Sequence, residues 1–314
     1  MKIAILDDYQ DACRGLDAWR ALAGHDVSVF RDTLKDETAL VERLRDFEAL
    51  VLIRERTRFT GALLERLPNL RALSQTGKAG PHIDLDTCKR LGIAVLEGSG
   101  SPYATAELTW GLIIAAMRRI PQEVENLKKG GWQQTVGRGL RGRTLGVYGL
   151  GRIGTVVAGY GKAFGMNVQV WGRQGSLDRA STAGLNPAAS REAFFSTSDV
   201  LSIHVRLAPD TRGLVTAQDL AWMKPDAVFV NTSRAELVVP GALAGALDAG
   251  RPGSAAVDVY EDEPVLGAAH PLLAMGNAIC TPHLGYVEKD GYELYFGAAF
   301  DNLAAFAAGK TTIA

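Results

Sequence analysis

Short apolar runs rich in β-branched residues alternate along this chain with longer amphipathic stretches. In the first hundred residues, charged segments such as 37–47 and 63–67 separate these runs. Runs of this kind predict strands, and the segments between them predict helices. Because strands that alternate with helices form a parallel sheet covered on both faces, we expect a first α/β unit. Its expected strands are 3–6, 27–30, 49–53, 70–74 and 94–96.

A second series of the same kind follows a hinge-like segment at 97–102, in which Ser101 is expected as a helix N-cap and Pro102 as the first helical residue. The helix expected at 103–119 is apolar nearly all round, so we expect it to be buried on several sides, between domains or between subunits. The expected strands of this second sheet are 144–148, 168–171, 200–204, 227–231, 255–259 and 278–280.

These patterns predict two parallel-sheet domains in a chain of 314 residues. The final helical segment, 291–308, is too short to be a domain and is expected to fold back onto the first unit. We therefore expect one domain at 1–98, completed by 289–314, and a second at 99–288. The chain would then cross between the domains twice.

Charge and cysteine content restrict the kinds of partner and site that the chain is expected to have. Lysine and arginine (34) almost balance aspartate and glutamate (35), and no basic run or charged tail indicates nucleic acid or a membrane surface as a partner. A small-molecule ligand is the expectation. The cysteines, Cys13, Cys88 and Cys280, are odd in number and widely spaced, which argues against disulfides and against a metal site. Together with an N-terminus that runs directly into a strand, they lead us to expect a cytoplasmic protein.

The most specific motif is the run Gly149-Leu150-Gly151-Arg152-Ile153-Gly154, which follows one expected strand and opens a helix. In a dinucleotide-binding turn, the first glycine permits the tight turn and the second lets backbone amides approach the pyrophosphate. The third lets the helix pack closely on the strand. The cofactor's charge then lies at a helix N-terminus. The sequence therefore predicts a nicotinamide dinucleotide site.

Three charged side chains follow later strands of the same unit: Arg234 after 227–231, Glu263 after 255–259 and His283 after 278–280. Because the carboxyl ends of parallel strands meet at one edge, these side chains are expected to converge beside the nicotinamide. Arginine can hold a carboxylate with two parallel hydrogen bonds, and histidine is suited to proton transfer near neutral pH. A neighbouring carboxylate favours the imidazolium. The set suits reduction of a 2-oxo acid.

In these motifs and their order, the sequence resembles the D-isomer-specific 2-hydroxyacid dehydrogenases over almost its whole length. The resemblance implies two Rossmann-like, doubly wound domains of the formate/glycerate dehydrogenase type, with the active site in the cleft between them. It also implies a homodimer and a D product. Within this family, reduction of glyoxylate or hydroxypyruvate is the expected reaction.

The resemblance assigns roles to individual positions. Arg234 would bind the substrate carboxylate and carbonyl, Glu263 would pair with the imidazole, and His283 would be the acid/base. Asp258 would face the nicotinamide, and Arg152 and Ile153 would lie on the pyrophosphate. The remaining expected cofactor contacts are Gly149, Gly151, Gly154, Arg173, His204, Val205, Thr232 and Gly285. For His204, packing on the cofactor and a purely structural role both stay open.

The resemblance also implies that a loop of the first domain binds substrate. Gly77-Lys78-Ala79-Gly80 would offer backbone amides to the substrate carboxylate, with Arg54 nearby, so Lys78, Ala79, Gly80 and Arg54 join the expected site. Two departures from the family pattern affect this loop: Ala79 replaces a usual glycine, and Pro81 replaces a usual acidic residue.

The strand at 168–171 ends in Gly172-Arg173 rather than in the carboxylate that would hydrogen-bond the 2′-hydroxyl of NAD. A carboxylate there would repel a 2′-phosphate, whereas a guanidinium can bind it. We therefore expect NADP(H) to be preferred, with NAD(H) as the alternative.

Two other functions are considered. A formate dehydrogenase shares the architecture but places a glutamine where Glu263 stands. A dinucleotide-responsive regulator or corepressor of the same fold would bind cofactor without turnover, because fold alone does not fix function. The complete arginine, glutamate and histidine set argues against both.

Overall fold

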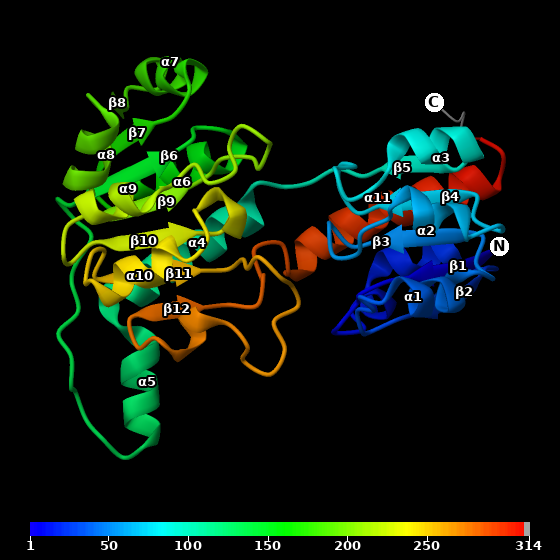
Figure 1. Ribbon diagram of the computed structural model, residues 1–314, viewed down its shortest axis with the longest axis horizontal. Helices are drawn as coiled ribbons and strands as arrows, with labels where there is room; N and C mark the ends of the chain where they lie inside the picture. The colour runs from blue at the N-terminus through cyan, green and yellow to red at the C-terminus, as the bar shows by residue number, and fades with distance from the viewer. Residues whose placement is uncertain (311–314) are drawn as a thin grey trace. The chain divides into compact units, whose positions relative to one another are not determined.

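The computed structural model describes residues 1–310, which form two compact α/β units. Unit 1 comprises Met1–Ser101 and the chain from Val287 onward, and unit 2 comprises Pro102–Tyr286. Each unit is built on its own parallel sheet (Figure 1). The expected fold of two Rossmann-like, parallel-sheet domains is therefore confirmed. The division at 1–98 with 289–314 and at 99–288, and the roles given to these domains, stay predictions.

Unit 1 has a five-stranded sheet in the order β2-β1-β3-β4-β5. Strands β3 and β4 are buried at every position because helices cover both faces of the sheet. The strands are β1 (Lys2–Ile5), β2 (Asp26–Val29), β3 (Ala49–Leu52), β4 (Ala72–Gln75) and β5 (Ala94–Glu97). The helices are α1 (Glu37–Leu44), α2 (Gly61–Glu65), α3 (Leu85–Leu91) and α11 (Lys289–Ala307), with short 3-10 helices η1 (Cys13–Gly15) and η2 (Asp17–Leu22).

Local chemistry explains where the unit 1 helices begin. The side chains of Asp36, Thr60 and Asp84 each accept a backbone N–H at the start of α1, α2 and α3. Helix α11 packs against β4 of the same unit, where the Ser74 hydroxyl donates to the carbonyl of Ala299 at 2.8 Å. The C-terminal helix is therefore an integral part of unit 1.

Unit 2 has a seven-stranded sheet in the order β12-β11-β10-β9-β6-β7-β8, and all its strand pairs are parallel. The order reverses between β6 and β9, which is where ligands bind in doubly wound sheets. The strands are β6 (Thr144–Tyr148), β7 (Asn167–Trp171), β8 (Asn186–Pro187), β9 (Val200–Ile203), β10 (Val228–Asn231), β11 (Ser254–Val257) and β12 (Ala278–Cys280).

Two apolar clusters cover the two faces of this sheet. Alternate residues of one strand join different clusters: Val228 and Val230 pack with α4 and α6, whereas Phe229 packs with α8, α9 and α10. This period of two is the reason that β10 is buried throughout. The helices are α4 (Tyr103–Arg118), α5 (Ile120–Lys128), α6 (Arg152–Ala163), α7 (Gln174–Thr182), α8 (Arg191–Thr197), α9 (Ala217–Trp222) and α10 (Ala242–Asp248), with η3 (Ala235–Leu237) and η4 (Pro271–Ala274).

Helix α4 differs from the sequence prediction at its start. Ser101 is not its N-cap: Pro102 occupies that position, and the first helical residue is Tyr103 rather than Pro102. Seven residues of α4 are buried, including Trp110 and Ile113. Helix α5, in contrast, has no buried residue in the described part of the chain, and it projects away from the sheet of unit 2 (Figure 1).

The three cysteines are free thiols. Cys13 and Cys88 are buried, whereas Cys280, at the end of the edge strand β12, is only partly buried. Among helices of the described residues, none combines the length and apolar character needed to span a bilayer.

Candidate active site

The glycine motif forms the turn between β6 and α6. Gly149 has φ +92°, in the region that favours glycine, and a Cβ there would lie 2.8 Å from the carbonyl oxygen of His204. A Cβ on Gly154 would collide with the carbonyl of Gly149. The protein itself therefore requires glycine at the first and third motif positions.

Gly151 is different, because a Cβ there would meet no described atom within 4 Å. Gly151 is the N-cap of α6, and no described side chain caps this helix. Packing within the chain therefore gives no reason for a glycine at this position, but a ligand close to the backbone would. An uncapped helix N-terminus beside open space suits the pyrophosphate of a dinucleotide. The residues present thus fit the expected cofactor.

His204 and Val205 follow β9 and pack under the glycine turn. The imidazole Nε2 of His204 lies 2.9 Å from the Ser202 hydroxyl. Burial lowers the pKa of His204 to about 4, so the ring is neutral near neutral pH. The carbonyl of His204 and the side chain of Val205 lie directly against Gly149, so the two residues support the turn. Contact of His204 and Val205 with the cofactor stays a prediction.

Arg173 follows the end of β7, and its guanidinium forms an ion pair with Asp210. Both side chains are exposed, at 73% and 66%. No local pattern of residues predicts this pairing, because the two residues lie 37 positions apart. A 2′-phosphate would have to compete with Asp210 for the guanidinium.

Arg234 lies in a turn after β10 that Asn231 organises. The Asn231 side chain donates to the carbonyl of Arg234 at 2.8 Å and accepts the amide of Ser233 at 3.0 Å. The Ser233 hydroxyl donates to Ile203 at the end of the neighbouring strand β9. The backbone that carries Arg234 is therefore fixed to two strands.

His283 and Glu263 form the central pair of the site. The imidazole Nδ1 lies 2.6 Å from Oε2 of Glu263, and Oε1 accepts the amide of Tyr260 at 2.9 Å. Burial raises the pKa of Glu263, but the hydrogen bond with His283 and the charges of His283 and Arg234 outweigh burial and hold this pKa below its usual value. A carboxylate held ionised in this way stabilises a charged imidazole beside it.

The backbone of His283 is in the left-handed region, with φ +52°. Conformations of this kind cost a non-glycine residue of order 1–3 kcal/mol and are concentrated at functional sites. Because Nδ1 is bound to Glu263, Nε2 is the ring nitrogen left to exchange a proton with a ligand. The Tyr286 ring packs edge-on against the imidazole, with the ring centres 5.3 Å apart.

Asp258, at the end of β11, fixes the segment that carries His283. Its carboxylate accepts the Thr281 hydroxyl at 2.6 Å and the amides of Leu284 and Gly285 at 2.7 and 2.8 Å. Burial raises the pKa of Asp258, and these hydrogen bonds offset the increase only in part. Asp258 thus positions the histidine loop, a role that sequence reasoning missed. Its contact with the nicotinamide stays a prediction.

Helix α4 reaches the same region through two threonines. The Thr105 hydroxyl donates to the carbonyl of Gly285 at 2.8 Å, and the hydroxyls of Thr109 and Thr232 are 2.7 Å apart. Helix α4 thus holds Thr232 and Gly285, two of the expected cofactor contacts, through these hydrogen bonds. The spacing of Thr105 and Thr109 along an apolar helix does not predict these contacts from the sequence.

The expected substrate-binding residues lie in unit 1. The guanidinium of Arg54 covers Gly77, where a Cβ would collide with it, and lies 5.9 Å from the centre of the Tyr295 ring. The backbone of Arg54 is also in the left-handed region, with φ +54°. The structure therefore places Arg54 beside the loop 77–80, and its role in substrate binding stays a prediction.

Within that loop, Glu97 binds two of the expected donors. The Ala79 amide donates to Oε1 of Glu97 at 2.8 Å, and the Lys78 ammonium lies 2.9 Å from Oε2. A Cβ on Gly80 would lie 3.3 Å from the His82 ring. A substrate carboxylate would have to replace Glu97 at Lys78 and Ala79, so their role, with that of Gly80, stays a prediction.

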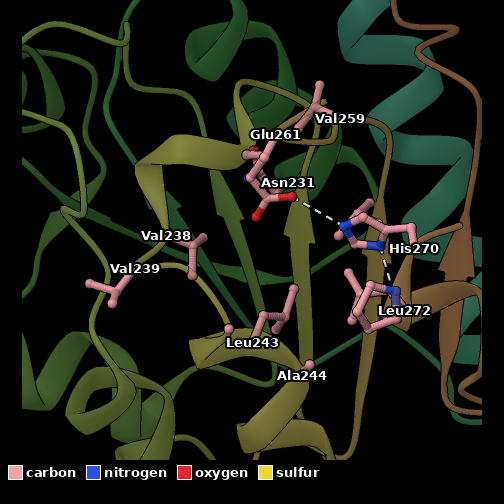
Figure 2. Close-up of a pocket in the computed structure, with 13 residues that line it drawn as sticks. Asn231, Val238, Val239, Leu243, Ala244, Val259, Glu261, His270 and Leu272 are labelled. Atoms are coloured by element: carbon pink, nitrogen blue, oxygen red, sulfur yellow. Dashed lines mark hydrogen bonds and ion pairs between the residues drawn. The ribbon is translucent and has the colours of Figure 1, made fainter. Parts of the chain in front are cut away.

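A cavity of about 220 Å³ in unit 2 is separate from these side chains. Figure 2 shows aliphatic side chains around it, with Glu261 and His270 joined at one wall, where Nε2 of His270 lies 3.1 Å from Oε2 of Glu261. Its lining includes Asn231 but none of the three expected catalytic residues. The glycine turn and the His283–Glu263 pair, rather than this cavity, make the candidate active site.

Comparison with known proteins agrees with this geometry. Residues 110–285 match the NAD binding domain of the D-isomer specific 2-hydroxyacid dehydrogenases, a span of more than half of the chain. The chain belongs to the D-isomer specific 2-hydroxyacid dehydrogenase family. The resemblance found in the sequence is thereby confirmed, and the matched span contains the glycine turn, Arg234, Glu263 and His283 of this family member.

Curated members of the 2-hydroxyacid dehydrogenase family that resemble the chain carry two different activities in their names. A glyoxylate reductase of Aeropyrum pernix is 37% identical over 281 residues, which cover 86% of this chain and 83% of that protein. A D-3-phosphoglycerate dehydrogenase of Methanocaldococcus jannaschii is 36% identical over 263 residues, 83% of this chain. The chain spans only 49% of the length of this second relative.

Solved structures of the 2-hydroxyacid dehydrogenase type match over nearly the whole chain. A phosphoglycerate oxidoreductase of Vibrio cholerae O395 has a TM-score of 0.96 and 56% identity, and the match covers 98% of this chain and 99% of that one. A D-lactate dehydrogenase of Aquifex aeolicus, complexed with NAD and lactic acid, has a TM-score of 0.78 and 26% identity, with 98% and 96% covered.

Proposed function

We propose that this protein reduces a small 2-oxo acid to the D-2-hydroxy acid with a nicotinamide dinucleotide, in a reaction of the glyoxylate or hydroxypyruvate type. The observation that carries the proposal is the 2.6 Å contact between His283 and Glu263 in the unit that holds the glycine turn. The glycine turn supplies a place for the cofactor, and the His283–Glu263 pair supplies a proton.

Each catalytic side chain has a defined task. Arg234 holds the substrate carboxylate and polarises the carbonyl, for which its planar fork is suited. His283, oriented by Glu263, gives a proton from Nε2 to the substrate oxygen as negative charge develops there. The bound cofactor would supply the hydride. Gly149, Gly151, Arg152, Ile153 and Gly154 would hold its pyrophosphate.

The glyoxylate reductases among the relatives support a small, unphosphorylated substrate. The names of relatives keep D-3-phosphoglycerate oxidation as the alternative substrate class.

For the cofactor, NADP(H) is the proposed preference, and NAD(H) the alternative. Gly172 and Arg173 end β7 without a carboxylate, which removes the usual ligand of the NAD 2′-hydroxyl. Arg173 provides a guanidinium at the same strand end.

A homodimer and a cytoplasmic location complete the proposal. The dimer is supported by exposed apolar side chains on α5 and in the segment after it, because such side chains mark contact surfaces. They are Ile120, Val124, Leu127, Trp132 and Val136, exposed by 45%, 47%, 58%, 74% and 91%.

The proposal is tested by mixing the purified protein with NADPH or NADH and a panel of 2-oxo acids while following the absorbance of the reduced nicotinamide. We expect oxidation of the cofactor with glyoxylate or hydroxypyruvate. Reduction of NADP+ or NAD+ by D-3-phosphoglycerate or by formate, without oxidation of NADPH or NADH by any 2-oxo acid, would replace the proposed substrate. Cofactor binding without turnover of any acid would indicate a dinucleotide-responsive regulator.

A further inference from the structure

The ion pair between Arg173 and Asp210 joins two segments beside the glycine turn. Arg173 comes after β7 and Asp210 lies in the connection after β9. In the sheet, β7 and β9 are the two neighbours of β6, whose end carries the turn that starts at Gly149. The ion pair therefore lies at the carboxyl end of the sheet, where the adenosine half of a dinucleotide binds in such folds.

The turn that carries Asp210 is held independently of Arg173. The Thr211 hydroxyl accepts the amide of Ala208 at 2.7 Å and donates to the carbonyl of Arg206 at 2.8 Å, and Thr211 is only 4% exposed. The backbone thus keeps the carboxylate near the end of β7 when Arg173 takes another partner.

We propose that Asp210 is a specificity-determining residue that opposes NADP(H) and keeps the chain able to use NAD(H). This rests on the proposed function, since it concerns the cofactor of the same site. A 2′-phosphate that binds Arg173 must displace the Asp210 carboxylate and is repelled by it. The uncharged ribose of NAD meets neither obstacle. Asp210 therefore acts against the preference that Arg173 creates.

Binding of 2′,5′-ADP and of 5′-AMP, measured by calorimetry, isolates the contribution of the 2′-phosphate. We expect Asp210→Asn to tighten 2′,5′-ADP by roughly fivefold, the upper range for an exposed ion pair, and to leave 5′-AMP unchanged. Because the groups are exposed, raising the salt concentration should reduce the gain. Asp178→Asn is the matched control, since Asp178 on α7 carries the same charge but bonds to Gln174.

A second comparison tests whether Asp210 acts through Arg173. In an Arg173→Gln background, the gain from Asp210→Asn should be smaller than in the native background. An equal gain in both backgrounds, an equal gain from Asp178→Asn, or no gain at all would overturn the proposal, as would failure of either nucleotide to bind.

These measurements need no turnover, so the two proposals fail separately. A protein that binds the nucleotides as expected but reduces no 2-oxo acid would refute the proposed function and support the role of Asp210. Suppose instead that Asp210→Asn reduces 2-oxo acids normally, with an unchanged ratio of kcat/KM for NADPH to kcat/KM for NADH. That result would support the proposed function and refute the role of Asp210.

Discussion

The imidazole Nδ1 of His283 lies 2.6 Å from Oε2 of Glu263, and the backbone amide of Tyr260 holds the other carboxylate oxygen. The glutamate is thus bound at both oxygens, and the ring is oriented with Nε2 available. Asp258 fixes the loop that carries the histidine through three further hydrogen bonds. The pair is built to keep one proton at a fixed place.

Replacing His283 with alanine should lower kcat by about 10² to 10⁴, the range for loss of a general acid. Dinucleotide affinity should change little, because the glycine turn lies at the end of another strand. Steady-state kinetics and calorimetric titration with NADPH measure the two quantities. An equal loss of cofactor affinity would show that the histidine acts on the fold or on the cofactor site instead.

Replacing Arg234 with lysine should lower kcat/KM for a 2-oxo acid by roughly 10²-fold, equivalent to about 3 kcal/mol of charged hydrogen bonding. Lysine keeps the charge but not the planar fork that matches a carboxylate. Kinetics with the acid and with the corresponding amide check this. The variant and the native protein should differ far less on the amide, and an equal defect on both substrates would contradict the assigned role.

Two glycine variants separate folding from cofactor binding. Gly151→Ala should fold with an unfolding free energy within about 1 kcal/mol of the native value, since its Cβ meets no described atom, yet bind dinucleotide at least about tenfold more weakly. Gly154→Ala should be destabilised instead, because its Cβ would collide with the carbonyl of Gly149. Urea unfolding and nucleotide titration of both proteins test this. Unimpaired binding by Gly151→Ala would remove the evidence for a close pyrophosphate.

The lowered pKa of Asp219 predicts how the free energy of unfolding depends on pH. Burial raises its pKa, but hydrogen bonds from Arg191 and Thr216 outweigh burial and hold the pKa below the usual 3.8. A carboxyl with a lowered pKa contributes stability that is complete above its unfolded value and is lost as the pH falls through its folded value. Asp219→Asn should therefore lower the free energy of unfolding by about 2 kcal/mol at neutral pH, a figure that allows for the partial exposure of Arg191. The loss should be smaller below pH 3.8.

Urea unfolding at neutral pH and below pH 3.8 measures how much stability the Asp219→Asn variant loses at each pH. Asp248→Asn on α10 is an exposed control of the same charge. A cost that does not shrink in acid would show that the carboxylate contributes through packing rather than through its charge.

Features that depend on residues close together in the chain could be predicted from the amino-acid order alone. The period of apolar positions predicts both parallel sheets, and the glycine spacing predicts the turn of residues 149–154. It also predicts that Arg234, Glu263 and His283 follow strands of one sheet, because the carboxyl ends of parallel strands share an edge. Each inference needs only the order of residues and the geometry of a strand or a helix.

Which polar groups bind one another depends on the tertiary structure and could not be predicted from the order of residues. Asp258 is engaged by the loop that carries His283, Glu97 binds Ala79 and Lys78, and Asp210 binds Arg173. Such partners lie far apart in the sequence and meet through loops whose conformations follow no repeating pattern. A hydrogen bond depends on distances of a few tenths of an ångström, which periodicity and composition do not fix.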